Sequence, residues 1–296
     1  MIYLQSQMQE KKQDNRDPYK AVWVSHSSMG DWLKCPRLYY LHNVYKNDKG
    51  RKVAVVSPHM SLGVAVHNVL ENLANFKTED RMQRDLLADY ESEWAKVTGE
   101  IGGFTSTEQE AEFKERGRGM IQRVINNPNF INKKTIKFPP APAGEKVDML
   151  PHYYLNDTDN IILCGKVDWI EYLDEVDGLR VIDFKTGRNE EKEESLQLPI
   201  YQLLLHNLQK RKVVGAQYWY LDMSDTPVDA NLPNLEESYE RVYNVAKQVA
   251  KTRESGVYDC PKGEAGCIHC RPYEAILRGE AKYVGKGEYK QDLYIL

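Results

Sequence analysis

The sequence of 296 residues contains no apolar run that approaches the roughly 20 residues of a membrane span. Its polar N-terminal stretch, from Gln5 to Arg16, also lacks the hydrophobic segment of a signal peptide. We therefore expect a cytoplasmic protein without a membrane partner. Cysteines are few, five in all, and in a reducing compartment they rarely form disulfides. They are instead candidates for metal ligands or buried thiols.

An excess of basic residues is missing as well. The formal net charge is -4 at pH 7, whereas nucleic-acid-binding domains are usually basic. Binding to a nucleic acid would therefore need a local basic surface. The candidate segments are Lys46–Lys52, Arg116–Arg123, Lys133–Lys137 and Lys210–Lys212. For any one of these segments alone, an ordinary solvated surface is the more frequent explanation.

Hydrophobic periodicity changes near the middle of the chain. Residues 1–20 are predicted to form a flexible tail, and residues 21–135 are predicted to be mainly helical. The expected helices span 62–76, 81–97 and 108–125. Beyond the proline-rich stretch Pro139–Pro142, strands are expected at 146–155, 161–173, 180–185 and 213–222, with helices at 196–209 and 236–254.

This order of elements predicts an α/β protein in which helices flank a mixed sheet. Hydrophobic residues make up 41% of the chain, which is ordinary for a globular protein with a buried core. We expect one domain over residues 21–296. It would comprise a helical part (21–135), a core (136–255) and a cysteine-rich C-terminal segment (256–296).

Two acidic residues and a lysine carry the main chemical signal. Asp183 and Lys185 alternate along a predicted strand and therefore share a face. A hairpin with a four-residue loop at 174–177 would place Asp168 directly opposite Asp183. Two carboxylates so close repel each other unless a divalent cation such as Mg²⁺ or Mn²⁺ neutralises them. A charge pair on the solvent side of a strand is the alternative interpretation.

The spacing of these residues resembles a known family. Gly165-x-x-Asp168, then Asp183-x-Lys185-Thr186-Gly187, then Gln197-x-x-x-Tyr201 is similar to the RecB-like nuclease domain of the PD-(D/E)XK superfamily. The match in order and spacing covers about 40 residues, and a fainter match extends to both ends. The resemblance implies a restriction-endonuclease-like sheet core and a metal-dependent deoxyribonuclease.

The resemblance also implies roles for individual residues. His67, in the form Gly63-x-x-x-His67, would bind metal together with Asp168, Asp183 and the backbone carbonyl of Phe184. Lys185 would activate or position the attacking water. Gln197 and Tyr201 would position the substrate strand. Without the resemblance, a single histidine on an amphipathic helix is more often a structural or surface residue.

The cysteines form a second candidate metal site. Cys267 and Cys270 have the spacing of two ligands that share a metal, and Cys260 precedes Cys267 by seven residues. The run Cys35-Pro36-Arg37-Leu38-Tyr39-Tyr40 resembles the first-cysteine segment of iron–sulfur RecB-like nucleases, which include the CRISPR adaptation nuclease and AddB. This implies a 4Fe–4S cluster held by Cys35, Cys260, Cys267 and Cys270, with structural Zn²⁺ as the alternative.

One position departs from that pattern. The family usually places its last cysteine after the Cys-x-x-Cys pair, where this chain has Ile276. Cys260 would then supply the fourth ligand from the other side. Independent buried thiols are the alternative interpretation, and Cys164, inside a predicted strand, is expected to be such a thiol.

Together these features predict a DNA nuclease of the exonuclease type that acts on single-stranded DNA or DNA ends. It would serve DNA repair and recombination or CRISPR spacer acquisition. The sequence has no Gly-x-x-x-x-Gly-Lys-Ser/Thr motif, so unwinding would come from a helicase partner, and a CRISPR integrase is another candidate partner. The alternatives are a DNA-end-binding assembly subunit with little or no catalysis, and a zinc-stapled interaction protein.

Overall fold

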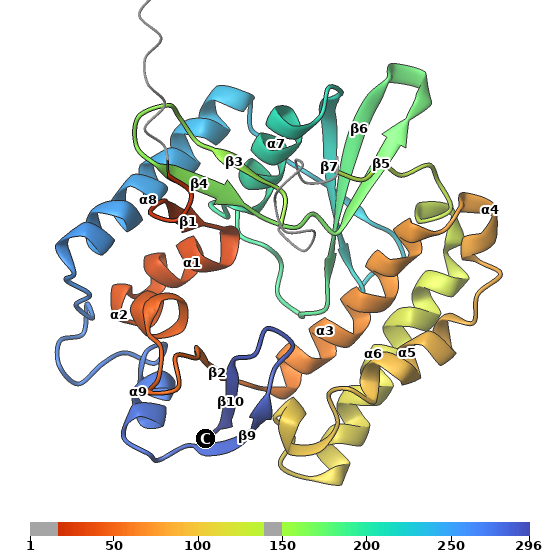
Figure 1. The fold of residues 1–296 in the computed structure, drawn as a ribbon. Coiled ribbons are helices and arrows are strands. Elements are labelled where there is room, and N and C mark those ends of the chain that lie inside the picture. The colour runs from red at the N-terminus through yellow and green to blue at the C-terminus, as the bar shows by residue number, and fades with distance from the viewer. Residues whose placement is uncertain (1–16, 139–149) are drawn as a thin grey trace, which may run out of the picture.

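A computed structural model describes residues 17–138 and 150–296 of the chain (Figure 1). The predicted tail lies outside the described residues up to position 16. In the described part, the strands form three sheets. The main sheet has the order β5 (Trp169–Leu173), β6 (Gly178–Lys185), β7 (Lys212–Tyr220), β8 (Val228–Ala230). It is mixed, as predicted, because β6 and β7 run parallel while β5 and β8 are antiparallel to their neighbours.

The described part contains two smaller sheets in addition to the main one. The first has the order β1 (Val22–Val24), β4 (Ile161–Cys164), β3 (His152–Tyr154). The second has the order β2 (Val53–Val55), β10 (Asp292–Ile295), β9 (Lys282–Lys286). Each joins an N-terminal strand in parallel to a strand from the second half of the chain. Segments far apart in sequence are therefore tied together at two places.

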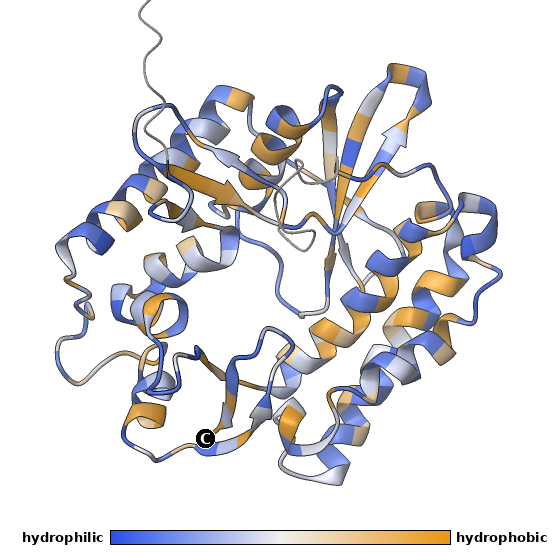
Figure 2. Cartoon of the chain, viewed as in Figure 1, coloured by the Kyte–Doolittle hydropathy of each residue, from blue (hydrophilic) through white to orange (hydrophobic). Residues whose placement is uncertain are grey.

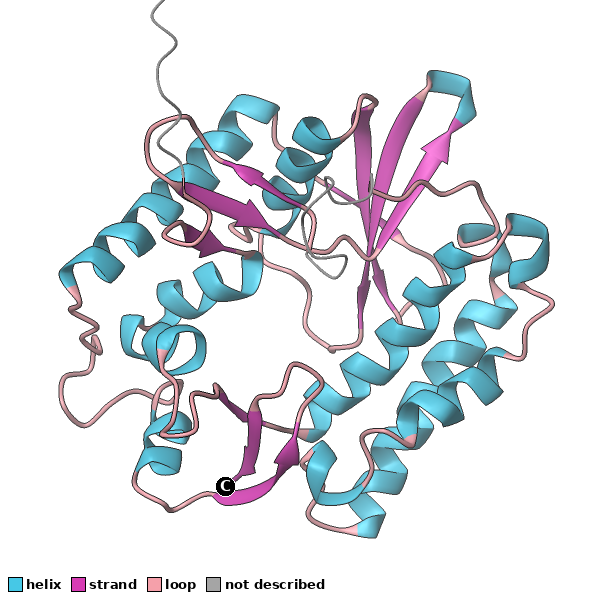
Figure 3. Ribbon diagram, in the orientation of Figure 1, coloured by secondary structure: helices cyan, strands magenta, loops and turns pink. Residues whose placement is uncertain are grey.

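Helices account for most of the first half of the described chain, as predicted. They are α1 (His26–Lys34), α2 (Pro36–Tyr39), the π-helical η1 (Tyr40–Val44), α3 (Pro58–Asn72), η2 (Leu73–Asn75), α4 (Thr78–Arg81), α5 (Leu86–Trp94), η3 (Gly99–Gly102), α6 (Thr107–Asn126) and η4 (Pro128–Phe130). The second half adds η5 (Asp174–Val176), α7 (Gln197–Leu208), α8 (Leu235–Ser255) and α9 (Arg271–Leu277). Figure 3 shows these helices around the strands.

Helices cover both faces of the main sheet. Leu179 and Val181 of β6 pack into a core with α7 and α8, whereas Ile182 and Phe184 pack against α3, α5 and α6. This alternation follows from the period of two along a strand. The short strand β4 is apolar along its length and almost fully buried between β1 and β3 (Figure 2). The main sheet thus lies between two layers of helices.

The predicted bounds of two elements were wrong. The strand expected at 161–173 is two strands, β4 and β5, which belong to different sheets. The chain changes sheets at Gly165, where an added Cβ would lie 3.0 Å from Leu204 of α7. The helix expected at 81–97 is shorter, because α5 begins only at Leu86, where Asp85 caps it by accepting a hydrogen bond from the N–H of Ala88 at 3.0 Å, and ends at Trp94. A continuous apolar pattern does not reveal such breaks.

Candidate active site

The β5–β6 hairpin brings the two predicted aspartates together. Its connection is the predicted four-residue loop at 174–177, and Trp169 pairs with Ile182. Extending this register by one residue puts Asp168 opposite Asp183, as predicted from the sequence. Asp183 is only 1% exposed, so its charge is surrounded by protein rather than water.

Helix α7 fixes one oxygen of the Asp183 carboxylate. Oδ1 accepts a hydrogen bond from Nε2 of Gln197 at 2.7 Å and another from the hydroxyl of Tyr201 at 3.0 Å. Gln197 and Tyr201 are one helical turn apart, so they face the sheet together. Oδ2 is buried and accepts no hydrogen bond among the described residues. Burial and the negative charge of Asp168 raise the pKa of Asp183 to about 7.

Lys185 lies on the same face of β6, two residues after Asp183. Its Nζ is 3.0 Å from Oδ2 of Asp183 and 2.8 Å from Oε2 of Glu191, and it donates to Oε1 of Gln197. Burial alone would lower the pKa of Lys185, but Asp183 and Glu191 raise it above its usual range. The ammonium group is therefore a fixed positive charge at the edge of the carboxylate pair.

Helix α3 supplies two further candidate metal ligands, His67 and Glu71. Nδ1 of His67 lies 3.4 Å from Oδ2 of Asp168 and 3.2 Å from Oε1 of Glu71. Burial would lower the pKa of His67, but the charges of Asp168 and Glu71 outweigh it and raise the pKa to about 10. Ligand atoms of His67, Glu71 and Asp168 all lie within 4.8 Å of one another, which is close enough to share an ion.

Three neighbours of this site were absent from the sequence prediction. Glu71 lies one helical turn after His67, and that spacing of four was the available signal. Lys166 forms an ion pair with Glu71, and Glu191 forms one with Lys185. Neither Lys166 nor Glu191 has a spacing that distinguishes it from the surface charges around it.

Phe184 contributes to the site through its backbone. Its N–H donates a hydrogen bond to Oδ2 of Asp168 at 3.0 Å. Its side chain is buried on the other face of the sheet, with ring contacts to Trp169 and Trp219. A role for the Phe184 carbonyl as a metal ligand stays a prediction.

The donor set fits a divalent cation. It combines carboxylate oxygens with one imidazole, which are donors that Mn²⁺ and Mg²⁺ accept to different degrees. Asp183 is outside the three residues whose ligand atoms lie within 4.8 Å of one another, and the partner of its Oδ2 is Nζ of Lys185 at 3.0 Å. A cation would also relieve the repulsion between Asp168 and Asp183 that raises the pKa of Asp183.

The four predicted cysteines converge at a separate place. Cys35 lies between α1 and α2, while Cys260, Cys267 and Cys270 lie between α8 and α9. All four Sγ atoms are within 4.8 Å of one another, and Cys270 is 3.7 Å from Cys267 and 3.8 Å from Cys260. The group is able to hold a metal. Ile276 packs beside it without replacing a ligand.

Cys164 lies apart from this group, as predicted. It is half-buried on β4, and its thiol contacts the backbone carbonyl of Val24 at 3.5 Å.

No helix in the described part of the chain is long and apolar enough to cross a membrane.

Comparison with known proteins adds one family match. The model described as "PD-(D/E)XK nuclease superfamily" matches residues 24–276, which is more than half of the chain. No curated protein matches the chain.

Proposed function

Because the chain belongs to the PD-(D/E)XK nuclease superfamily, we propose that it is a metal-dependent deoxyribonuclease that hydrolyses phosphodiester bonds. The observation that carries this proposal is the pair Asp168 and Asp183, with Nζ of Lys185 at 3.0 Å from Oδ2 of Asp183. We further propose exonuclease action on single-stranded DNA or DNA ends. A binding-only subunit would have no use for this costly buried charge cluster.

The proposed metal ligands are His67, Asp168, Asp183 and the carbonyl of Phe184, with Glu71 as an added candidate. Imidazole beside carboxylates suits Mn²⁺ better than Mg²⁺, which prefers oxygen ligands and keeps several waters. A bound ion would lower the pKa of a water and offset charge on the phosphate. The protein supplies the fixed geometry, since Asp168 is held by a backbone N–H and Asp183 by two side chains of α7.

Lys185 is proposed to orient the water and to stabilise negative charge on the phosphate in the transition state. Its two carboxylate contacts, to Asp183 and Glu191, hold the ammonium group in one place before substrate binds. Gln197 and Tyr201 are proposed to fix the orientation of the Asp183 carboxylate and to guide the substrate strand.

For the cysteine group we propose a structural metal. The resemblance implies a 4Fe–4S cluster, in which each thiolate binds a different iron. Four thiolates around one tetrahedral zinc at about 2.3 Å would be about 3.8 Å apart. The distances of 3.7 and 3.8 Å to Cys270 therefore favour a single Zn²⁺ ion. Metal analysis of anaerobically purified protein, with absorbance near 400 nm as the mark of a cluster, distinguishes the two.

The test of the main proposal is Mn²⁺-dependent degradation of end-labelled single-stranded DNA. We expect the wild type to cut, and Asp183→Ala and Lys185→Ala to lose at least about a hundredfold in rate. Matched controls are Asp229→Ala and Lys212→Ala, which remove the same groups from exposed positions of the same sheet. The end label reports cleavage direction. A wild type that binds DNA but does not cut would replace the proposal with a DNA-end-binding assembly subunit.

The pathway is proposed only in outline. DNA repair or recombination with a helicase partner, or CRISPR spacer acquisition with an integrase partner, would each supply the DNA ends that such an enzyme consumes. Co-purification of the full chain with candidate partners would distinguish these two settings.

A further inference from the structure

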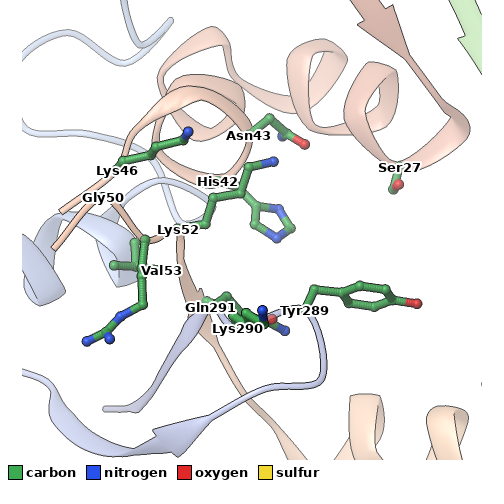
Figure 4. A pocket seen from close by; sticks show the side chains of 12 residues that line it. Ser27, His42, Asn43, Lys46, Gly50, Lys52, Val53, Tyr289, Lys290 and Gln291 are labelled. Atoms are coloured by element: carbon green, nitrogen blue, oxygen red, sulfur yellow. The ribbon is translucent and has the colours of Figure 1, made fainter. Parts of the chain in front are cut away.

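A cavity of about 740 Å³ lies between the N-terminal helices and the C-terminal hairpin. Its walls come from η1, from β2 with the residues before it, and from the turn between β9 and β10 (Figure 4). These segments are far apart in sequence and meet because β2 pairs with β10. The cavity is thus a product of the tertiary fold.

The lining of this cavity is basic. It includes Lys46, Lys52 and Lys290, and no aspartate or glutamate is among the residues that line it. Arg51 is neutralised by Asp292 at 2.8 Å. No ion pair engages Lys46, Lys52 or Lys290 within the described parts of the chain. Three unneutralised ammonium groups around one space favour an anion in that space.

The pKa of Lys52 reflects the positive charges around it. Partial burial lowers its pKa, and so do the positive charges of Lys46 and Arg253. A phosphate between Lys46 and Lys52 would remove this repulsion. The imidazole of His42 is fixed in the same wall, because Asp31 holds its Nδ1 at 2.8 Å and Tyr273 packs on the ring at 5.2 Å. Figure 4 shows His42 and Tyr289 directed into the cavity.

The cavity is linked to the carboxylate site through the start of α1. Tyr289, in the turn between β9 and β10, is 85% exposed. Ser27, on the opposite wall, follows His26, which lines a neighbouring pocket together with Glu191, the ion-pair partner of Lys185. A chain leaving the site would therefore meet the cavity next.

We propose that this cavity binds the single DNA strand adjacent to the scissile bond. Lys46, Lys52 and Lys290 contact its phosphates, and the exposed ring of Tyr289 stacks on an unpaired base. Basic grooves with aromatic platforms are the usual way of holding a single strand without reading its sequence. The inference rests on the proposed nuclease function and names the path of its substrate.

The test measures binding without cleavage. Fluorescein-labelled oligothymidylate is titrated with the full chain in Ca²⁺, over a series of salt concentrations. We expect the double variant Lys46→Gln/Lys52→Gln to bind about tenfold more weakly. We also expect the slope of log affinity against log salt to become shallower by about 1.4, since each single-strand phosphate contact contributes about 0.7. Tyr289→Ala is expected to weaken binding about tenfold with no change of slope.

The matched control is Lys77→Gln/Lys247→Gln, which changes the net charge equally at exposed positions outside the cavity and outside the candidate basic segments. An unchanged slope in the cavity variant, or an equal change in the control, would overturn the inference. Equal losses on a blunt duplex would overturn its single-strand part. Hydrolysis of bis(p-nitrophenyl) phosphate tests the proposed function separately. If the wild type hydrolyses that ester but the slope is unchanged, the nuclease proposal stands and the cavity proposal fails.

Discussion

At the scale of single residues, the two carboxylate oxygens of Asp183 have different roles in the site. Oδ1 is held by Gln197 and Tyr201, while Oδ2 lies 3.0 Å from Nζ of Lys185. A carboxylate held by one oxygen keeps the other in a fixed direction. Preorganisation of this kind is what makes a buried charge useful in catalysis rather than only destabilising.

Tyr201→Phe isolates this contact because it removes one hydroxyl and keeps the ring. We expect kcat/KM for DNA cleavage to fall about tenfold, since hydrogen bonds to charged groups contribute ~1.5–3 kcal/mol. Tyr172→Phe is the control, because its hydroxyl donates to Asp177 at 2.8 Å on the surface. Equal rates for the two variants would remove Tyr201 from the site.

Glu71→Gln tests the residue that the sequence did not indicate. We expect the affinity for Mn²⁺, measured by calorimetry, to fall by about tenfold, because the change removes charge beside His67 and Asp168. Glu240→Gln on the exposed side of α8 should leave the affinity unchanged. An unaltered affinity in Glu71→Gln would limit that residue to its ion pair with Lys166.

Cys164 offers a pH prediction that does not involve the metal sites. Burial raises the pKa of its thiol to about 11, and only the thiolate is nucleophilic. Iodoacetamide at pH 8 should therefore label Cys164 at least about a hundredfold more slowly than free cysteine. The rate should still be rising at pH 9.5, as followed by mass spectrometry of its peptide. A plateau near pH 9 would contradict a buried thiol.

At the scale of elements, the packing of α5 against α6 depends on one glycine. A Cβ on Gly117 would lie 2.1 Å from the hydroxyl oxygen of Tyr90, so the two helices can approach only without a side chain there. These helices in turn support α3, which carries His67. A substitution at Gly117 is therefore expected to affect the position of α3 and, with it, of His67.

Gly117→Ala is expected to lower the free energy of unfolding by about 2 kcal/mol through overpacking. Gly119 is the matched control on the same helix, since a Cβ there meets nothing within 4 Å. Gly119→Ala should raise stability by up to about 1 kcal/mol from helix propensity alone. Urea denaturation measures both, and an equal sign for the two variants would refute the packing argument.

At the scale of the whole molecule, the cysteine group joins the two ends of the described chain. Cys35 belongs to the N-terminal helices, and its three partners follow α8. A shared metal closes a loop of more than 200 residues and so reduces the entropy of the unfolded chain. The sheet of β2, β10 and β9 lies on the same side and packs with this group.

Cys270→Ser should therefore destabilise the fold by at least about 4 kcal/mol, by comparison with covalent cross-links that close loops of this order. Thermal melting would show it as a marked drop in Tm. Cys164→Ser, outside the group, should change Tm far less. Similar melting of both variants would mean that the metal contributes little to stability.

Local patterns in the sequence determined much of this protein. The alternation around Asp183 and Lys185, the four-residue loop at 174–177 and the helical spacing of Gln197 and Tyr201 depend on residues near each other in the chain. Backbone geometry alone therefore fixes which side chains share a face. The resemblance then indicated that Cys35 would join the late cysteines, and the fold brings them together.

Only the tertiary structure decided the rest. Whether the apolar run 161–173 stays in one sheet depends on α7, which lies against Gly165. The approach of Glu71 to Asp168 and the basic cavity between η1 and the β9–β10 turn require elements that are far apart in sequence. Such contacts are selected by the packing of whole layers, whose energy is summed over many distant residues and leaves no periodic signal in any one segment.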